Sequence, residues 1–311
     1  MPTESPKQRA ARLRELLDRA NRAYYVDASP IMSDPEFDTL LAELATLERD
    51  HPELDDPDSP THRVGGETVG GFDTVPHAVP MLSIDNSYSE SDVREWYDRV
   101  LRGLSQNAAA KRGPSLFDAP TPAASGVPPR LIADPKIDGV ALSLRYERGR
   151  LVRAVTRGDG QKGDDITPNA RAVRSIPLTL HAADHDSPAR TRRTPPPEIP
   201  EVLEVRGEVF IPLKEFERIN RERQRDGLEL FANPRNSCAG TLKQLDPAVV
   251  AQRRLGFVAH GKGEIVSDSP FAASHSELMQ RLRALGIPTS PHLVACSTID
   301  DALAAIAAFD K

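Results

Sequence analysis

Apolar positions at helical spacing dominate the first 70 residues. The first set predicts one helix and consists of Leu13, Leu16, Leu17, Ala20 and Tyr24. A polar break follows at 33–35, and a second set predicts another helix that ends at His51-Pro52; this set is Phe37, Leu40, Leu41, Leu44 and Leu47. The pattern therefore predicts a small helical domain over residues 1–70.

The start of the second predicted helix allows two interpretations. Asp34 can cap the helix with Pro35 in its first position, since proline needs no hydrogen-bond partner there. Alternatively, Ser33 is the cap and Glu36 closes a capping box. The sequence leaves both open.

A hairpin is the clearest strand signal in the remainder, which we assign to a second domain over residues 71–311. Alternating apolar side chains at 140–146 predict one strand, the turn lies at 147–150 with Gly149, and residues 151–156 return. Segments 105–130 and 181–200, rich in Ala, Pro, Ser and Gly, predict mobile loops. A Gly-rich polar loop at 157–165 precedes a helix, with Thr167 as its cap and Pro168 as its first residue.

Residues 202–211 predict a strand with two different faces. Leu203, Val205, Val209 and Ile211 share the apolar face, whereas Glu204, Arg206 and Glu208 share the other. A charged face within a domain has to meet water or a ligand. Further helices are predicted at 213–227, from Pro234 through Lys243, at 276–285 and at 299–309. Together these elements indicate an α+β fold in which antiparallel sheets are flanked by helices.

Charge and cysteine content narrow the function classes. A net charge of −6 disfavours a dedicated nucleic-acid-coating module, which is usually basic. Cys238 and Cys296 lack the spacing of a zinc site, so we expect reduced thiols in a cytoplasmic protein. The N-terminus has no secretory pattern, and no stretch of 18 apolar residues predicts a membrane span.

The chemistry is carried by Lys136-Ile137-Asp138-Gly139, which follows a predicted strand at 131–134. Alone, K-x-D-G is a weak pattern, and a surface lysine in a turn is the better interpretation. Here a hairpin, R-G-D-G at 157–160 and R-G-E at 206–208 follow it, and this series resembles the nucleotidyltransferase family of DNA ligases and mRNA capping enzymes. The segments EVRGEVF, FANPRN, AGTLKQLDP, PMLSIDNSY and DPEFDTLLAELATLE resemble NAD-dependent DNA ligases, from about residue 10 to the C-terminus.

The resemblance implies covalent nucleotidyl transfer by Lys136. Its amine attacks the α-phosphorus of NAD, expels nicotinamide mononucleotide and later passes AMP to a 5′-phosphate at a DNA nick. The neutral amine that attacks is rare at neutral pH, so the site has to favour it through burial and nearby cations, among which Arg157 is the best candidate.

The resemblance also assigns contacts to the adenylate half. Arg157 holds ribose or phosphate, and Glu208 bonds the ribose hydroxyls. Ser83 and Ile84 match the adenosine-contacting segment, and Asp134 stands where the family usually has Glu. From the residues alone, an ion pair of Glu208 with Arg206 or Arg157 is equally possible.

The resemblance implies that the helical domain over residues 1–70, called the front module below, binds the nicotinamide half of NAD. Tyr24 can stack on the cationic pyridinium, while Asp34 and Asp38 accept from ribose hydroxyls. The matching contact set also contains Tyr25, Pro35, Glu36 and Phe37, of which Tyr25 replaces a usual His and Phe37 a usual Tyr. Both replacements remove a polar contact, which lowers the expected affinity for NAD. Without the resemblance, Asp34 is equally well a plain N-cap and Asp38 a first-turn charge.

DNA and metal contacts complete the expectation. Four cations form either a basic patch for the DNA backbone or a solvated face: Arg235, Lys243 and the pair at 253–254. Lys243 stands where the family usually has Arg. Mg²⁺ or Mn²⁺ is expected on the phosphates with no direct protein ligand. Zn²⁺ belongs to a four-cysteine site in the family's C-terminal part, past residue 311.

We therefore expect the chain to be the monomeric, adenylating part of a longer enzyme that acts in DNA replication and repair. It binds NAD, self-adenylates weakly and does not seal nicks, because the family's final phosphate-contacting lysine lies past residue 311. Two rivals remain: an ATP-dependent ligase or capping-type nucleotidyltransferase, and a non-catalytic NAD-binding scaffold. The front module disfavours the first, because ATP has no nicotinamide half, and the K-x-D-G lysine disfavours the second.

Overall fold

The computed structural model covers all 311 residues and describes 4–63, 71–110, 128–181 and 197–309. The chain divides into two compact units. The large unit comprises 1–82 and 137–289, and the small unit comprises 83–136 and 290–311. Most of the segments expected as mobile loops, 111–127 and 182–196, lies outside the described residues. The functional division at residue 70 stays a prediction.

Two helices form the front of the large unit: α1 (Pro6–Tyr25) and α2 (Asp34–Asp50). Ser33 is the N-cap of α2, with Glu36 closing a capping box, so the second of the two interpretations is the one observed. Their apolar stripes meet in one cluster of buried side chains: Ala10, Leu13, Leu17, Ala20, Phe37 and Leu44. Amphipathic spacing thus folds this module as predicted.

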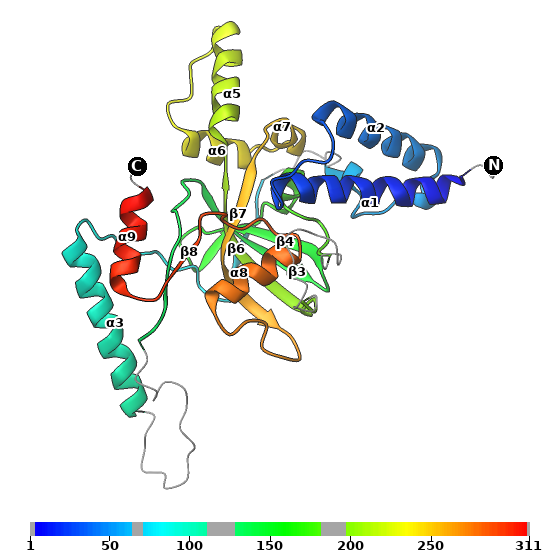
Figure 1. Cartoon of the computed structure of the whole chain (residues 1–311). Coiled ribbons are helices and arrows are strands. Elements are labelled where there is room, and N and C mark those ends of the chain that lie inside the picture. The colour runs from blue at the N-terminus through cyan, green and yellow to red at the C-terminus, as the bar shows by residue number, and fades with distance from the viewer. Residues whose placement is uncertain (1–3, 64–70, 111–127, 182–196, 310–311) are drawn as a thin grey trace. The chain divides into compact units, whose positions relative to one another are not determined.

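The main sheet of the large unit has four antiparallel strands in the order β4-β3-β6-β7 (Figure 1). They are β3 (Val140–Glu147), β4 (Arg150–Thr156), β6 (Val202–Phe210) and β7 (Gly256–Val266). The β3–β4 turn places Arg148 and Gly149 at φ 48° and 81°, a left-handed backbone that glycine adopts without strain. One sheet face is the predicted apolar one, since Leu203, Val205 and Val209 have no exposed surface.

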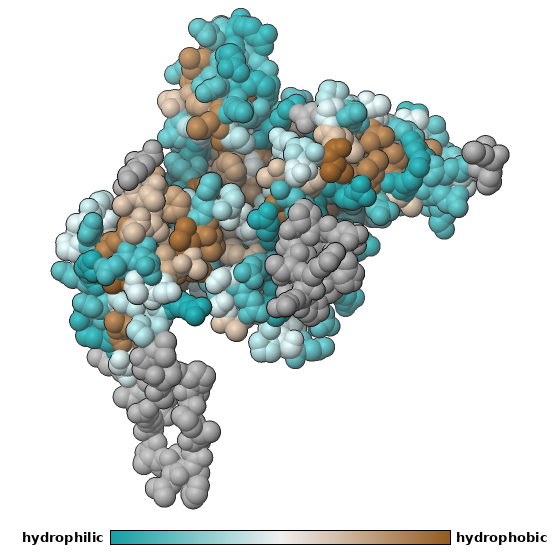
Figure 2. Space-filling model, viewed as in Figure 1, coloured by the Kyte–Doolittle hydropathy of each residue, from teal (hydrophilic) through white to brown (hydrophobic). Residues whose placement is uncertain are grey.

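Helices and a two-stranded ribbon surround this sheet. The helices are α4 (Thr167–Ala172), α5 (Leu213–Arg225), α6 (Pro234–Leu242), α7 (Pro247–Ala251) and α8 (His275–Ala284). Strands β1 (Thr74–Pro76) and β5 (Lys162–Asp164) form the ribbon, so part of the predicted polar loop is a strand. The surface of α5, at the top of Figure 2, is mostly hydrophilic.

The predicted cap of α4 is wrong. The N-cap is Ile166, which makes no side-chain cap bond, and Thr167 is the first helical residue. Its hydroxyl donates to Asp165 and accepts from the backbone N–H of Ala154 at 2.9 Å. The Thr167 hydroxyl oxygen, which a cap would use to accept from the helix, accepts instead from Ala154 of β4.

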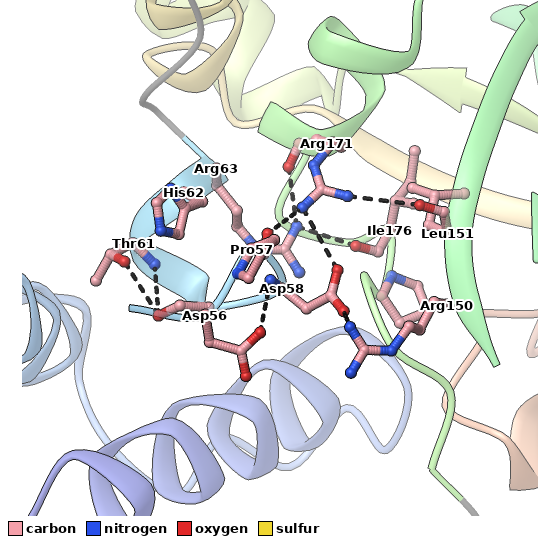
Figure 3. Close-up of polar contacts among 12 residues, drawn as sticks. Asp56, Pro57, Asp58, Thr61, His62, Arg63, Arg150, Leu151, Arg171 and Ile176 are labelled. Carbon is pink, nitrogen blue, oxygen red and sulfur yellow. Dashed lines mark hydrogen bonds and ion pairs between the residues drawn. The ribbon is translucent and has the colours of Figure 1, made fainter. Parts of the chain in front are cut away.

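The link between the helical front and the sheet is a set of buried polar contacts (Figure 3). Two short 3-10 helices, η1 (Pro52–Leu54) and η2 (Pro60–Arg63), follow α2. Arg63 donates from Nη1 to the carbonyl oxygens of Arg171, Val173 and Ile176 at 3.2, 3.0 and 3.0 Å. Burial lowers its pKa to about 10. The charge is retained because these carbonyls replace lost water.

The small unit has its own two-stranded sheet, formed by β2 (Leu131–Ala133) and β8 (Val294–Cys296). Two helices accompany it, α3 (Glu90–Ala110) and α9 (Ile299–Phe309), joined by an ion pair of 2.6 Å between Arg94 and Asp300. The loop predicted from residue 105 was placed too early, because α3 continues to Ala110. The Ala-rich sequence there favours helix.

The α+β prediction is confirmed by the front helices and the antiparallel sheets. Both cysteines are free and buried. Among the described residues, no helix combines the length and the apolar character that a membrane crossing requires.

Candidate active site

The charged face of the sheet brings two predicted site residues to opposite sides of one strand. Ala141 of β3 pairs with Glu208 of β6. On the other side, the backbone N–H of Arg157, one residue past β4, donates to the carbonyl oxygen of Ala141 at 3.1 Å. Arg157 and Glu208 therefore flank Ala141 in one row across three strands. Side chains in one such row share a face of the sheet.

Glu208 lies in a partly buried setting. Its carboxylate is 3.9 Å from Nε2 of His260. Burial, and secondly the charge of Glu208, raise the pKa of the Cys238 thiol to about 12. The carboxylate is thus partly shielded from water but remains accessible, with a side-chain exposure of 19%.

The expectation that all three charges of β6 face water or a ligand is wrong for Glu204. It is buried, with only 4% of its surface exposed. Its carboxylate accepts from the Ser143 hydroxyl at 2.6 Å and from the backbone N–H of Glu264 at 3.3 Å. Arg206 donates to it at 3.4 Å. Neighbouring strands, not solvent, satisfy this group.

Arg206 also holds the chain segment that leads to the small unit. Its guanidinium donates to the carbonyl oxygens of Val79 and Pro80, the latter at 2.8 Å. The backbone N–H of Met81 donates to the carbonyl of Gly160 in the R-G-D-G loop at 2.8 Å. Segment 79–81 is therefore fastened to both β6 and the loop after β4.

The K-x-D-G segment spans the boundary between the units. Lys136, exposed, is the last residue of its stretch in the small unit, and Ile137 opens the large unit. Asp138 accepts from Arg235 at 3.2 Å. A Cβ on Gly139 would lie 2.2 Å from the carbonyl oxygen of Val209, so only glycine fits beside β6.

The other predicted adenylate residues belong to the small unit. Ser83 and Ile84 lie in an irregular segment before α3, and Ile84 is 68% exposed. Asp134 follows β2, and its Oδ1 is buried without a hydrogen-bond partner among the described residues. Such an orphaned acceptor is rare in folded proteins.

The predicted nicotinamide residues lie at the end of α1 and the start of α2. Tyr24 is 50% exposed, and its ring meets that of Tyr25 edge to face at 4.7 Å. Phe37 is buried and Asp38 exposed. The side chain of Asp34 lies outside the described residues, Pro35 is the second residue of α2, and Glu36 is occupied by the capping box.

The sequence did not single out a partner for this segment. The guanidinium of Arg174 lies 5.3 Å from the ring centroid of Phe37 and forms an ion pair of 3.2 Å with Asp38. These residues are 136 apart in sequence, so local patterns carry no signal for the contact.

The predicted DNA-facing cations are engaged by carboxylates. Arg235 pairs with Asp138, as described above, and Lys243, one residue past α6, pairs with Asp164 at 3.0 Å. Both side chains remain more than half exposed. Burial lowers the pKa of Arg253.

One group of described residues has the composition of a metal site: Glu48, Asp55 and His62, whose ligand atoms lie within 4.8 Å of one another. Arg14 donates to Glu48 at 2.6 Å, and His62 Nε2 lies 2.6 Å from Asp55. These contacts already engage both carboxylates, so we assign no metal to the group. The expectation that no protein side chain binds the metal directly stays a prediction.

Two known families match this chain. Residues 123–311 match the family described as NAD-dependent DNA ligase adenylation domain, and residues 3–65 match the DNA ligase-like, N-terminal NAD⁺-binding domain. This chain belongs to the NAD-dependent DNA ligase adenylation family. The resemblance inferred from K-x-D-G, R-G-D-G and R-G-E is thereby confirmed.

Relatives named DNA ligase are similar to this chain over nearly its whole length. The chain is 41% identical to one from Porphyromonas gingivalis over 98% of its own length, and 44% identical to one from Akkermansia muciniphila over 96%. A relative from Synechococcus is 44% identical over 96%. The chain spans only 34–40% of these ligases, which are longer proteins.

Proposed function

We propose that this chain carries out the first step of NAD-dependent DNA ligation, in which Lys136 becomes linked to AMP. The supporting observation is the row across β4, β3 and β6 in which Arg157 and Glu208 flank Ala141. Strand β3 begins four residues after Lys136, so the motif lysine precedes this row directly in the chain.

The reaction exchanges one bond at phosphorus for another. The neutral amine of Lys136 attacks the α-phosphorus of NAD, a P–N bond forms, and the bond to the bridging oxygen breaks. Nicotinamide mononucleotide leaves with that oxygen, and the lysine proton passes to solvent. The phosphoramidate keeps AMP activated, which divides one difficult transfer into two easier ones.

The polar residues of the row suit the adenylate half of NAD. The Glu208 carboxylate can accept from two ribose hydroxyls, and Arg157 offers donors and a positive charge to phosphate. Ser83, Ile84 and Asp134 contribute contacts to adenosine. The buried, unpaired Oδ1 of Asp134 suits an acceptor that awaits a donor such as the adenine amino group.

The front module binds the nicotinamide half through the 34–38 segment and the two tyrosines. Tyr24 offers an exposed aromatic face to the pyridinium cation, and Asp34 and Asp38 accept from ribose hydroxyls. Tyr25, Pro35, Glu36 and Phe37 complete the surface. Phe37 lacks the hydroxyl of Tyr, and Tyr25 lacks the ring nitrogens of His, so binding relies more on stacking and charge.

Mg²⁺ fits this arrangement as an ion carried by the phosphates of NAD. Two carboxylates of the region, Asp138 and Asp164, already pair with Arg235 and Lys243. Because these carboxylates are already paired, a metal held mainly by phosphate oxygens and water suits the site. Bound there, it would stabilise negative charge on the phosphate as the P–N bond forms.

The protein to which this chain corresponds is proposed to seal nicks in double-stranded DNA during replication and repair. Arg235 and Lys243 are proposed to face the DNA backbone in that reaction, where a substrate phosphate would replace their carboxylate partners.

Intact-protein mass spectrometry tests the proposal. Wild-type chain incubated with NAD and Mg²⁺ is expected to gain one AMP, and K136A is expected to gain none. K214A, which removes an exposed lysine on α5, serves as the matched control and keeps the gain. Transfer from ATP instead of NAD would favour an ATP-dependent nucleotidyltransferase. NAD binding without transfer in any variant would favour a scaffold.

A further inference from the structure

A cation of the protein itself occupies part of the front segment to which the proposed function assigns the nicotinamide half of NAD. Arg174 lies against Phe37 at 5.3 Å from the ring centroid and pairs with Asp38 at 3.2 Å. An aromatic face beside a carboxylate is the environment that a flat organic cation selects. The guanidinium of Arg174 is such a cation.

We propose that Arg174 is a specificity-determining residue that competes with the nicotinamide cation for the Phe37–Asp38 surface. This inference rests on the proposed function. The guanidinium and the pyridinium are both planar and positive. They cannot share one ring face and one carboxylate, because like charges at contact distance repel. NAD therefore has to displace Arg174, and a ligand without a cation gains nothing from doing so.

The backbone around Arg174 is held firmly, while its side chain is partly exposed to solvent. Arg63 binds the carbonyl oxygens of Val173 and Ile176 at 3.0 Å each, and Ser175 donates to the carbonyl of Leu255 at 3.3 Å. The side chain of Arg174 is 37% exposed. A firmly held backbone with a partly exposed side chain suits a residue that a ligand displaces.

A second arginine contact to the front module offers a control. Arg283 at the end of α8 donates to the carbonyl oxygen of Val26 at 2.7 Å. It contacts the front module directly after α1, at a backbone carbonyl outside the Phe37–Asp38 surface. Loss of this contact loosens the module without vacating the Phe37–Asp38 surface.

Isothermal titration calorimetry of the full chain with nicotinamide mononucleotide, and separately with AMP, tests the inference. R174Q is expected to bind nicotinamide mononucleotide about three- to tenfold more tightly than wild type, a modest gain because the ion pair with Asp38 that is lost is exposed. AMP binding is expected to stay unchanged. R174K, which keeps the charge but lacks the planar group, is expected to fall between the two and guards against misfolding of R174Q.

R283Q is expected to match wild type with both ligands. Equal or weaker binding of nicotinamide mononucleotide by R174Q would overturn the inference, as would an equal gain in R283Q, which would indicate general loosening. These outcomes leave the proposed function intact if wild type still acquires AMP from NAD. A wild-type chain that neither binds nicotinamide mononucleotide nor acquires AMP contradicts both.

Discussion

Arg206 donates from Nη1 to the carbonyl oxygen of Pro80 at 2.8 Å, across 126 residues of sequence. The same guanidinium donates to the buried carboxylate of Glu204. One side chain thus satisfies a buried charge in the sheet and fixes the segment that precedes Ser83. Its loss should affect both stability and adenylate binding.

We predict that R206Q lowers the free energy of unfolding by about 1–3 kcal/mol, because it leaves Glu204 and two carbonyls with fewer donors. Urea unfolding followed by circular dichroism measures this. R153Q is the matched control, since Arg153 is 52% exposed and pairs with Asp165 at 3.6 Å. It should change stability by less than about 1 kcal/mol. Equal effects of the two substitutions would contradict the buried role of Arg206.

G139A should disturb the junction between the K-x-D-G motif and the sheet. The added Cβ would lie 2.2 Å from the carbonyl oxygen of Val209, so β3 or β6 has to shift. We expect a loss of about 1–3 kcal/mol in stability, typical of overpacking, together with reduced AMP transfer. In G240A on α6 the Cβ meets nothing within 4 Å, and stability should be kept or rise by about 1 kcal/mol. A stable, fully active G139A would show that the close approach is not required.

E208Q tests the ribose contact. Replacing the carboxylate by an amide removes a charged acceptor that contributes about 1.5–3 kcal/mol, so AMP transfer from NAD should slow by about 10- to 150-fold. Single-turnover transfer measured by mass spectrometry gives the rate. E217Q, which changes a carboxylate 66% exposed on α5, should leave it unchanged. A wild-type rate in E208Q would remove Glu208 from the site.

Asp18 on α1 should make stability depend on pH. Burial raises the pKa of this carboxyl, although the charge of Arg63 lowers it in part. The folded chain then binds a proton more tightly than the unfolded chain. The contribution of Asp18 to stability is therefore lost as the pH rises from about 4 through the raised folded-state pKa.

The substitution D18N removes the ionisable carboxyl and with it the loss of stability that wild type undergoes as the pH rises. Its advantage over wild type in the urea midpoint should be greater at pH 8 than at pH 4, because the cost of keeping this buried carboxyl ionised grows as the pH rises. D50N, at a carboxylate 56% exposed, should show no such trend. An advantage of D18N that does not vary with pH would contradict the assignment.

The sequence predicted the structure best where the deciding interactions are local. The turn at Gly149 depends on residues within four positions of one another. So does the capping box of Ser33 and Glu36, which was one of two alternatives that the sequence left open. Thr167 was assigned wrongly because a distant strand contact took its oxygen.

The site depends on contacts that no local pattern contains. Glu204 looked like a residue facing water or a ligand, yet Ser143, 61 residues away, and Glu264, 60 residues away, bury and satisfy it. The contact of Arg174 with Asp38 is formed only when the front module packs on the sheet domain. The motifs identified the family, but the roles of Lys136, Arg157, Glu208 and the front residues remain predictions.

The most direct test of the account is tandem mass spectrometry of the wild-type chain after incubation with NAD and Mg²⁺, with peptides prepared at neutral to alkaline pH to preserve a phosphoramidate. AMP is expected on the peptide that contains Lys136, with fragment ions that assign it to that side chain. AMP on another lysine, or none while NAD is bound, would contradict the claim that Lys136 is the nucleophile.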